Sequence, residues 1–170
     1  MLEVIINRRA CRAFIDRPVE DEKIKEIIDA GLLAPSGMNR QTSVIIAIKD
    51  KKLRDELMEL NRSIMGRDGD PFYGAPVILL VIADKQGLSM HDGAATIENM
   101  LLEATNQGLA SCWIHRAEEE IRSEKGQKLL AFTGLNFDDY VGIGHVIIGY
   151  AKDGYVPNPK VIRDNRVFIK

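Results

Sequence analysis

Residues 77–83 read VILLVIA, an uninterrupted apolar run rich in β-branched side chains. A strand with one wetted face alternates apolar and polar residues, and this run does not alternate, so both of its faces must be covered. Helices packed on the two sides of a sheet provide that cover. The run therefore predicts a layered α/β domain with residues 77–83 as a central strand.

Predicted helices and strands alternate along the rest of the chain. Apolar residues from Ile24 to Leu32 recur at helical spacing, and Pro35 ends that helix. Asp50 is placed to cap the next helix. No repeat or linker interrupts residues 1–170, so we expect one domain of α/β content, with helices on both faces of a mixed sheet. The expected helices are 20–33, 50–64, 88–107 and 118–132, and the expected strands are 44–48, 77–83, 110–114, 141–150 and an extended piece at 166–169.

Charge is distributed unevenly along the chain. Residues 1–17 carry four arginines against two acidic residues, a net +2, and residues 152–170 carry +3, so the 134 residues between them carry −7. Nucleic-acid-binding domains usually show a larger basic excess than a chain with a pI of about 6.0. Two short basic ends on an acidic body favour a small anionic ligand, although solvated charge at loose termini gives the same arithmetic.

No membrane partner is expected. The longest apolar stretch, residues 75–83, contains Pro76 and is far shorter than the roughly 20 residues of a membrane-spanning helix. The first residues lack the charge order of a secretion signal, and Cys11 and Cys112 are too few for a disulfide framework. These features predict a cytoplasmic protein.

The common nucleotide-binding signatures are missing. The sequence has no Gly-x-x-x-x-Gly-Lys-Ser/Thr loop, and Gly142-Ile143-Gly144 continues into a predicted strand rather than opening a helix. We interpret Gly142, Gly144 and Gly149 as places where the sheet bulges or meets another backbone closely.

Nucleophilic and metal chemistry are also weakly supported. Cys112 and His115 are too few for a zinc site, and residues three positions apart on a strand point to opposite faces. Cys112 is therefore predicted to be a small core residue, and His145, inside an apolar strand, a local hydrogen-bonding residue. Ser36 and Ser43 lack the context of a catalytic serine. No metal site is expected.

Three short segments are better candidates for a binding site. In residues 8–14 (RRACRAF), a chain leaving a helix would place Arg8 and Arg12 one turn apart, so that two guanidinium groups converge on one phosphate. Residues 34–41 (APSGMNRQ) form a loop able to pack against a planar ligand and hydrogen-bond its edge. Residues 108–116 hold the only tryptophan, Trp113, where a strand end would line a pocket. The plainer interpretations are a solvated basic turn, a helix-to-strand turn and a core tryptophan.

Taken in this order, the three segments resemble the FMN-dependent nitroreductase family. Its members carry Arg-Arg-Ser-x-Arg-x-Phe, then Ala-Pro-Ser-x-x-Asn-x-Gln, and later Gly-Leu-Gly-Ser-Cys-Trp-Ile. Residues 8–14, 34–41 and 108–114 match these motifs. Residues 92–102 look like the family's central helix, and residues 142–150 look like its late strand. The match spans nearly the whole chain.

The resemblance implies an α+β nitroreductase fold with a mainly antiparallel central sheet flanked by helices, and a C-terminal segment that extends onto a partner subunit. It also implies a homodimer with two noncovalent FMN molecules at the subunit interface and NADH or NADPH as the reductant. Nitroaromatics, quinones or similar electron-poor acceptors would be reduced in a ping-pong cycle that needs no protein nucleophile.

The resemblance also assigns residues to the cofactor, position by position. Arg12 has two implied roles: it would contact FMN, and it would stabilise negative charge on the pyrimidine ring of the reduced flavin. The implied FMN contacts are Arg8, Arg9, Ala10 (through its backbone N–H) and Arg12 at the phosphate, ribityl chain or pyrimidine edge; Pro35, Ser36, Gly37 and Asn39 from the other subunit; Trp113, Ile114 and His115 along the isoalloxazine; and Lys160 and Arg163 as a second phosphate cluster.

The sequence departs from the family pattern at two positions. Ala10 stands where the family usually has serine, which removes one hydroxyl, and Thr42-Ser43 stands where Pro-Trp is common. The chain is also shorter than many relatives, which leaves little for a lid. Three alternatives stay open: a flavin-binding relative that fragments flavin or removes halogen, a non-catalytic flavin- or nucleotide-binding module, and a dimeric scaffold without ligand.

Overall fold

The central sheet has four strands in the order β1-β2-β4-β3. The computed structural model describes residues 1–85 and 88–170. The strands are β1 (Ser43–Ile48), β2 (Val77–Asp84), β3 (Ala110–Ile114) and β4 (Tyr140–Gly149). All three neighbouring pairs are antiparallel. Among described residues, parallel pairing is limited to an isolated bridge between Ala10 and Ser111, so the expected mainly antiparallel sheet is confirmed.

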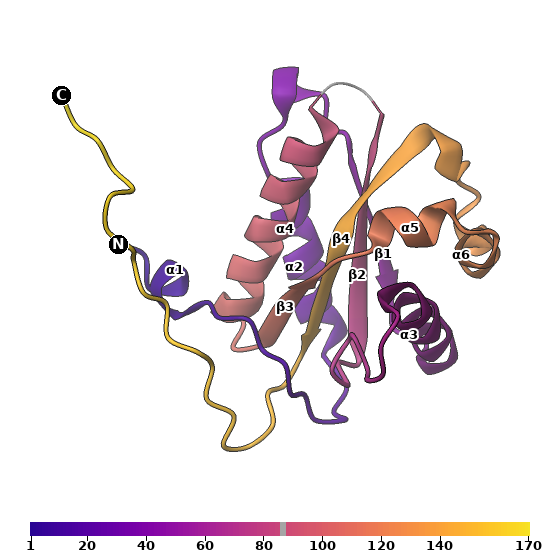
Figure 1. Cartoon of the computed structure of the whole chain (residues 1–170), viewed down its shortest axis with the longest axis horizontal. Helices are drawn as coiled ribbons and strands as arrows, with labels where there is room; N and C mark the ends of the chain where they lie inside the picture. The colour runs from indigo at the N-terminus through magenta and orange to yellow at the C-terminus, as the bar shows by residue number, and fades with distance from the viewer. Residues whose placement is uncertain (86–87) are drawn as a thin grey trace.

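Helices cover both faces of this sheet (Figure 1). Residues 77–83 are all buried and alternate between two core clusters. On one face, Ile78, Leu80 and Ile82 pack in a cluster with side chains of α3 (Lys51–Met65) and α5 (Ala117–Arg122). On the other face, Val77, Leu79, Val81 and Ala83 pack with side chains of α2 (Asp21–Leu32) and α4 (Ser89–Asn106). The uniform apolar run is thus the centre of a three-layer domain.

Two helix ends are formed by residue types that favour them. The Asp50 side chain accepts a hydrogen bond from the Leu53 N–H at 2.8 Å and so caps α3. Gly108, directly after the α4 cap, has φ +71°, the left-handed conformation that ends many helices. None of the helices in residues 1–85 and 88–170 is long and apolar enough to cross a membrane.

The prediction of a single helix over residues 118–132 is wrong. The chain forms α5, then α6 (Glu124–Leu129) and a 3₁₀ turn, η2 (Ala131–Thr133). Ser123 between the two helices is extended, and its hydroxyl accepts the Gly126 N–H at 3.0 Å. A Cβ at Gly126 would lie 2.0 Å from the Glu120 carbonyl oxygen. The capping serine and the side-chain-free glycine together allow α6 to turn back against α5.

Replacing Gly126 by alanine is therefore expected to destabilise the fold. The new methyl group meets backbone, which cannot rotate away, so the free energy of unfolding should fall by about 1–3 kcal/mol. Urea denaturation measures the loss. Gly66→Ala is the control, because a Cβ there meets nothing within 4 Å and only the left-handed backbone is strained. Equal stabilities for Gly126→Ala and the wild type would contradict the close contact.

The glycines of β4 serve close contacts, as expected. A Cβ at Gly142 would lie 2.3 Å from the Glu118 nitrogen, and one at Gly144 would lie 2.3 Å from Trp113 Nε1. The pairing register between β2 and β4 also shifts between Val81 and Ile82, which marks a bulge.

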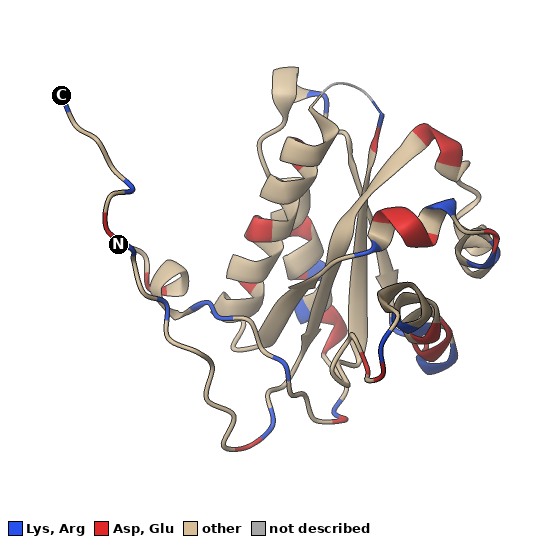
Figure 2. Cartoon of the chain, in the orientation of Figure 1, with Lys and Arg blue, Asp and Glu red and all other residues tan. Residues whose placement is uncertain are grey.

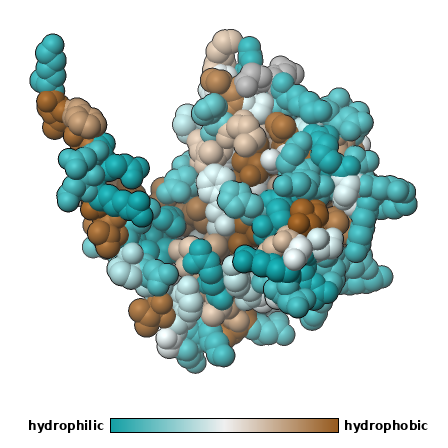
Figure 3. All heavy atoms as spheres, viewed as in Figure 1, coloured by the Kyte–Doolittle hydropathy of each residue, from teal (hydrophilic) through white to brown (hydrophobic). Residues whose placement is uncertain are grey.

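The two ends of the chain lie on one side of the domain (Figure 1). A short helix, α1 (Glu3–Asn7), precedes an extended N-terminal stretch, and residues 152–170 form a tail without helix or strand. Figure 2 shows lysines and arginines along both segments, and Figure 3 shows apolar side chains on the projecting tail. Its most exposed apolar residues are 74–92% exposed: Val156, Val161, Ile162, Val167, Phe168 and Ile169.

Candidate functional site

The N-terminal stretch lies along the free edge of β3. Ala10 bridges Ser111, and the Cys11 N–H donates to the Ser111 carbonyl at 2.8 Å. The helix α1 ends at Asn7, and residues 8–14 continue from it as an extended chain. The expectation that Arg8 and Arg12 lie one helical turn apart is wrong. The pairing with β3 nevertheless brings the arginine segment to the tryptophan segment.

Residues 150–155 form the other border of this stretch. Phe14 bridges Ala151, and the Lys152 N–H donates to the Ala13 carbonyl at 2.9 Å. The Tyr155 hydroxyl donates to the Ala10 carbonyl at 3.1 Å and accepts the Arg12 N–H at 3.2 Å. Tyr155 was not singled out from the sequence, because no motif surrounds it. It fixes the backbone between the arginines.

The side chains of Arg8, Arg9 and Arg12 differ in how many hydrogen bonds and ion pairs they make within the chain. Arg12 is exposed, and its guanidinium makes no hydrogen bond or ion pair with any residue that the structure describes. Arg8 lies 3.7 Å from Glu98 on α4, with 20% of its side chain exposed. Arg9 donates to the carbonyls of Ile6 and Arg8 at 2.5 and 2.7 Å. Arg8 and Arg12 are thus the better placed of the three to bind an anion.

The end of β3 presents an aromatic surface on the strand that pairs with the arginine segment. Cys112 and Ile114 are buried on the α3 side, whereas Trp113 is 36% exposed. The Trp113 indole covers the backbone at Gly144, and its centroid lies 6.5 Å from that of the His115 ring. The core-tryptophan interpretation is therefore wrong. Trp113 has an open face that a planar ligand can contact.

The two cysteines of this region are not poised for nucleophilic attack. Both are buried, and burial raises the pKa of the Cys112 thiol and that of the Cys11 thiol above the ordinary value. Both thiols therefore stay protonated at neutral pH. Within the described residues no group of histidines, cysteines and carboxylates could hold a metal ion.

The loop at residues 34–41 is held at the other end of α4. It contains the 3₁₀ turn η1 (Gly37–Asn39) and left-handed backbone at Met38, Asn39 and Gln41, with φ of 56°, 54° and 52°. Asp92, in the first turn of α4, accepts the Gly37 N–H at 2.9 Å and the Thr42 hydroxyl at 3.1 Å. Strained backbone tied down by a buried carboxylate is common at binding sites.

Asp92→Ala is expected to loosen this loop. It leaves the Gly37 N–H and the Thr42 hydroxyl without their acceptor, so the free energy of unfolding should fall by about 1–3 kcal/mol. Limited proteolysis should then cut within residues 36–41 faster than in the wild type. Asp68→Ala, at an exposed site beyond α3, is the control. Wild-type cleavage in Asp92→Ala would show that the carboxylate does not hold the loop.

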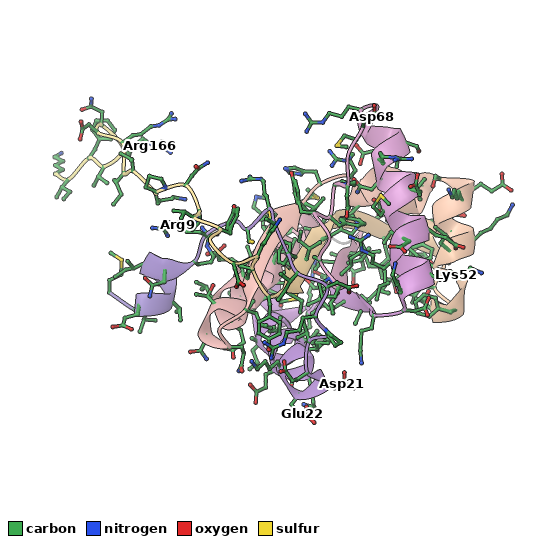
Figure 4. The ribbon with its side chains drawn as sticks, turned by 90° about the horizontal axis from the view of Figure 1, so that it is seen from below. Arg9, Asp21, Glu22, Lys52, Asp68 and Arg166 are labelled. Carbon is green, nitrogen blue, oxygen red and sulfur yellow. The ribbon has the colours of Figure 1, made fainter. Side chains whose placement is uncertain are left out.

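One chain does not assemble all the predicted site residues. Among described residues no hydrogen bond or ion pair joins residues 34–41 to residues 8–14, and Figure 1 shows η1 beyond the N-terminal end of α4. Lys160 and Arg163 lie on the exposed tail. Figure 4 shows Arg9 where the N-terminal stretch meets the tail and Arg166 far out along it. The structure brings together residues 8–12 and 111–115; residues 35–39 and the tail lysine and arginine stay apart from them.

Known proteins share the sequence pattern and the fold of this chain. A model of the Nitroreductase family matches residues 5–150. An FMN reductase (NAD(P)H) of Bacillus subtilis strain 168 is 32% identical, over 95% of this chain and 70% of its own. A nitroreductase of Bacteroides fragilis, solved with bound FMN, superposes with a TM-score of 0.91 at 26% identity, over 99% of this chain and 97% of its own. An FMN-bound nitroreductase of Desulfitobacterium hafniense superposes at 0.76 and 26% identity, over 99% and 96% of the two chains.

Proposed function

The chain belongs to the nitroreductase family, and from that membership we propose that it is a homodimeric oxidoreductase that binds FMN noncovalently and takes electrons from NADH or NADPH. Its acceptors are nitroaromatics, quinones or similar electron-poor molecules. The observation that carries this proposal is the junction of residues 8–12 with β3, where the arginine segment pairs with the strand that carries the exposed Trp113. The FMN in the two solved relatives and the NAD(P)H-linked FMN reductase support it.

The residues at this junction fit a phosphorylated, planar group. Ser111 is 2% exposed, and its hydroxyl has no partner among the described residues. A buried hydroxyl without a partner normally indicates a missing polar neighbour. Ser111 is the bridge partner of Ala10, so this hydroxyl lies where the N-terminal stretch meets β3. Arg8, Arg12 and Ser111 would hold the polar end, and Trp113 and His115 would line the ring.

A second subunit completes the proposed site. Pro35, Ser36, Gly37 and Asn39 lie at the far end of α4, so they reach a flavin only from a partner chain. The apolar side chains of the tail are left exposed by the residues that the structure describes, which supports the extension of the tail over the partner subunit. Lys160 and Arg163 on the tail add positive charge for the phosphate. The tail thus links dimer formation to cofactor binding.

The chain supplies placement and charge for this chemistry. When bound, FMN would supply the redox chemistry of a ping-pong cycle between NADH or NADPH and the acceptor. Arg12 carries a permanent positive charge that would stabilise negative charge developing on the pyrimidine ring on reduction. The protonated thiols of Cys11 and Cys112 take no part.

Anaerobic mixing with NADH or NADPH tests the proposed function. A reductase should lose its flavin absorbance and recover it when a nitroaromatic or quinone is added. A flavin-binding module would hold the colour without turnover, and a flavin-fragmenting or dehalogenating relative would fail to recover it with simple acceptors. Either of those results would reject the reductase function.

Arg12→Ala is expected to slow flavin reduction more than it weakens FMN binding. Losing one charge-assisted interaction at the developing charge corresponds to about 1.5–3 kcal/mol, a fall of roughly 10- to 150-fold in the reduction rate. Stopped-flow reduction of the flavin-loaded variant measures it, and fluorescence titration gives the FMN affinity. Arg12→Lys, which retains the charge, should recover part of the rate. An unchanged rate in flavin-loaded Arg12→Ala would reject the role.

A further inference from the structure

A fully buried polar network lies directly behind the end of β3. Glu120 on α5 and His145 on β4 are both 0% exposed, and Glu120 Oε2 lies 2.7 Å from His145 Nε2. Asn61 on α3, also 0% exposed, donates through Nδ2 to the other Glu120 oxygen. The network therefore connects three elements through one carboxylate. Among the described residues, none assigned to FMN is joined to this network by a side-chain hydrogen bond.

The same Asn61 amide holds the chain where it leaves β3. Its Nδ2 donates to the His115 carbonyl at 3.1 Å, and its Oδ1 accepts from Arg116 Nε at 2.8 Å. Arg116 has φ +80°, a left-handed conformation that residues with a side chain rarely adopt. One buried amide thus binds the His115 carbonyl and the Arg116 side chain, and these two contacts keep a strained bend in place.

The hydrogen bond from Asn61 to the His115 carbonyl fixes the direction of the main chain at the candidate site. In a trans peptide the C=O and N–H point in opposite directions, so a His115 carbonyl bound to α3 turns the Arg116 N–H away from α3. Trp113 and His115 are two positions apart on the same piece of chain, with their rings in contact range. A change in the backbone at this bend is therefore expected to move the Trp113 and His115 rings.

We propose that Asn61, Glu120 and His145 are positioning residues that hold the His115–Arg116 bend and so fix the surface offered by Trp113 and His115. The effect on turnover rests on the proposed function, because it needs a flavin on that surface. The bend itself is a property of the chain alone and can be measured without flavin.

The hydrogen bonds of the network require two acceptor atoms on residue 120, so replacing one carboxylate oxygen by an NH₂ group disrupts them. The two oxygens of Glu120 face two donors, the Asn61 amide and a proton on His145 Nε2. His145 Nδ1 has no partner among described residues, so a proton there would be a buried donor without an acceptor. Glutamine at position 120 offers one oxygen and one NH₂ group. One donor then faces another donor, and the Asn61 amide is displaced.

The test uses Trp113, the only tryptophan, as a reporter of the bend. Near-ultraviolet circular dichroism and acrylamide quenching are recorded on flavin-free protein, and stopped-flow reduction by NADH on flavin-loaded protein. Glu120→Gln should shift both Trp113 signals and slow reduction by about tenfold or more, because a small misplacement of the surface that positions the reacting groups slows the chemical step. Ile27→Ala is the control: it opens a cavity at a fully buried position of α2, in the core cluster on the opposite face of the sheet, so it should lower stability and leave the signals and the rate unchanged.

Exchanging the amide of Asn61 and the carboxylate of Glu120 separates an effect on the bend from an effect on the free energy of unfolding. In Asn61→Asp combined with Glu120→Gln, the new amide donates to the new carboxylate, and the His145 proton keeps an acceptor. The His115 carbonyl alone loses its donor. Stability should recover relative to Glu120→Gln, while the Trp113 signals and the reduction rate stay altered. Where Glu120→Gln does not fold, Asn61→Ala, which leaves Glu120 and His145 paired, is expected to give the same altered signals.

Two results would overturn the proposal. Wild-type Trp113 signals in both the exchanged variant and Asn61→Ala would show that the network does not set the bend. Altered signals with an unchanged reduction rate would show that the bend does not matter for the flavin. A wild-type protein that takes up no flavin would instead reject the proposed function, and the Trp113 signals would still decide whether Asn61 holds the bend.

Discussion

A chain ending at Tyr155 is expected to lose both its dimer and its flavin. The deleted residues carry six apolar side chains that are 74–92% exposed within one chain. Burying one such side chain contributes about 1.5–3 kcal/mol, so covering only two of them on a partner corresponds to roughly 10²- to 10⁴-fold in the dimer dissociation constant. Sedimentation velocity should show monomers at concentrations where the full chain is dimeric. The contacts of Tyr155 with Ala10 and Arg12 remain, so the fold should persist.

A charge-only variant separates the two roles of the tail. Lys160→Ala combined with Arg163→Ala keeps every apolar side chain, so it should stay dimeric while binding FMN more weakly. A truncated chain that remains dimeric and flavin-loaded would show that the tail does not cover the partner.

Arg8→Glu is expected to weaken FMN binding by about 10²- to 10³-fold. The change removes a charge-assisted hydrogen bond worth about 1.5–3 kcal/mol and places a carboxylate near the phosphate. Fluorescence titration of flavin-free protein with FMN measures the affinity. The new carboxylate also faces Glu98, which lies 3.7 Å from Arg8 in the wild type, so part of any loss arises from local repulsion.

The reciprocal exchange isolates the contribution of the phosphate. Arg8→Glu combined with Glu98→Arg restores the ion pair with α4, and it should recover stability without recovering full FMN affinity. Arg17→Ala removes a nearby charge that stacks on Tyr150, outside the site, and should leave the affinity unchanged. Wild-type affinity in Arg8→Glu would exclude this arginine from the phosphate site.

The fold could be predicted largely where the information is local. Residues 77–83 specify a doubly covered strand by themselves, because each of them must be buried. The Asp50 cap and the Gly108 helix end likewise depend on a few neighbouring residues. The break in the expected helix 118–132 was missed, although Ser123 followed by Glu124 is an N-cap pattern. The close approach of Gly126 to the Glu120 carbonyl, which allows the chain to turn, is not visible in the local pattern.

The site could be predicted only in part, because its geometry comes from distant contacts. Arg8 and Arg12 lie on an extended stretch because Ala10 pairs with Ser111, a hundred positions away. No local pattern announces that pairing. The same holds for Asn61 and Glu120, which are polar residues on helices whose sequence spacing gives no sign that they meet. Resemblance supplied the candidate residues, and the structure showed that one chain holds only part of them together.

The visible absorption spectrum of the purified protein shows whether it binds FMN at all. We expect a yellow protein with flavin bands, a dimer in solution, and a chromophore that is released on denaturation and identified as FMN, at one per chain. A colourless protein that stays monomeric and takes up no added FMN would contradict it.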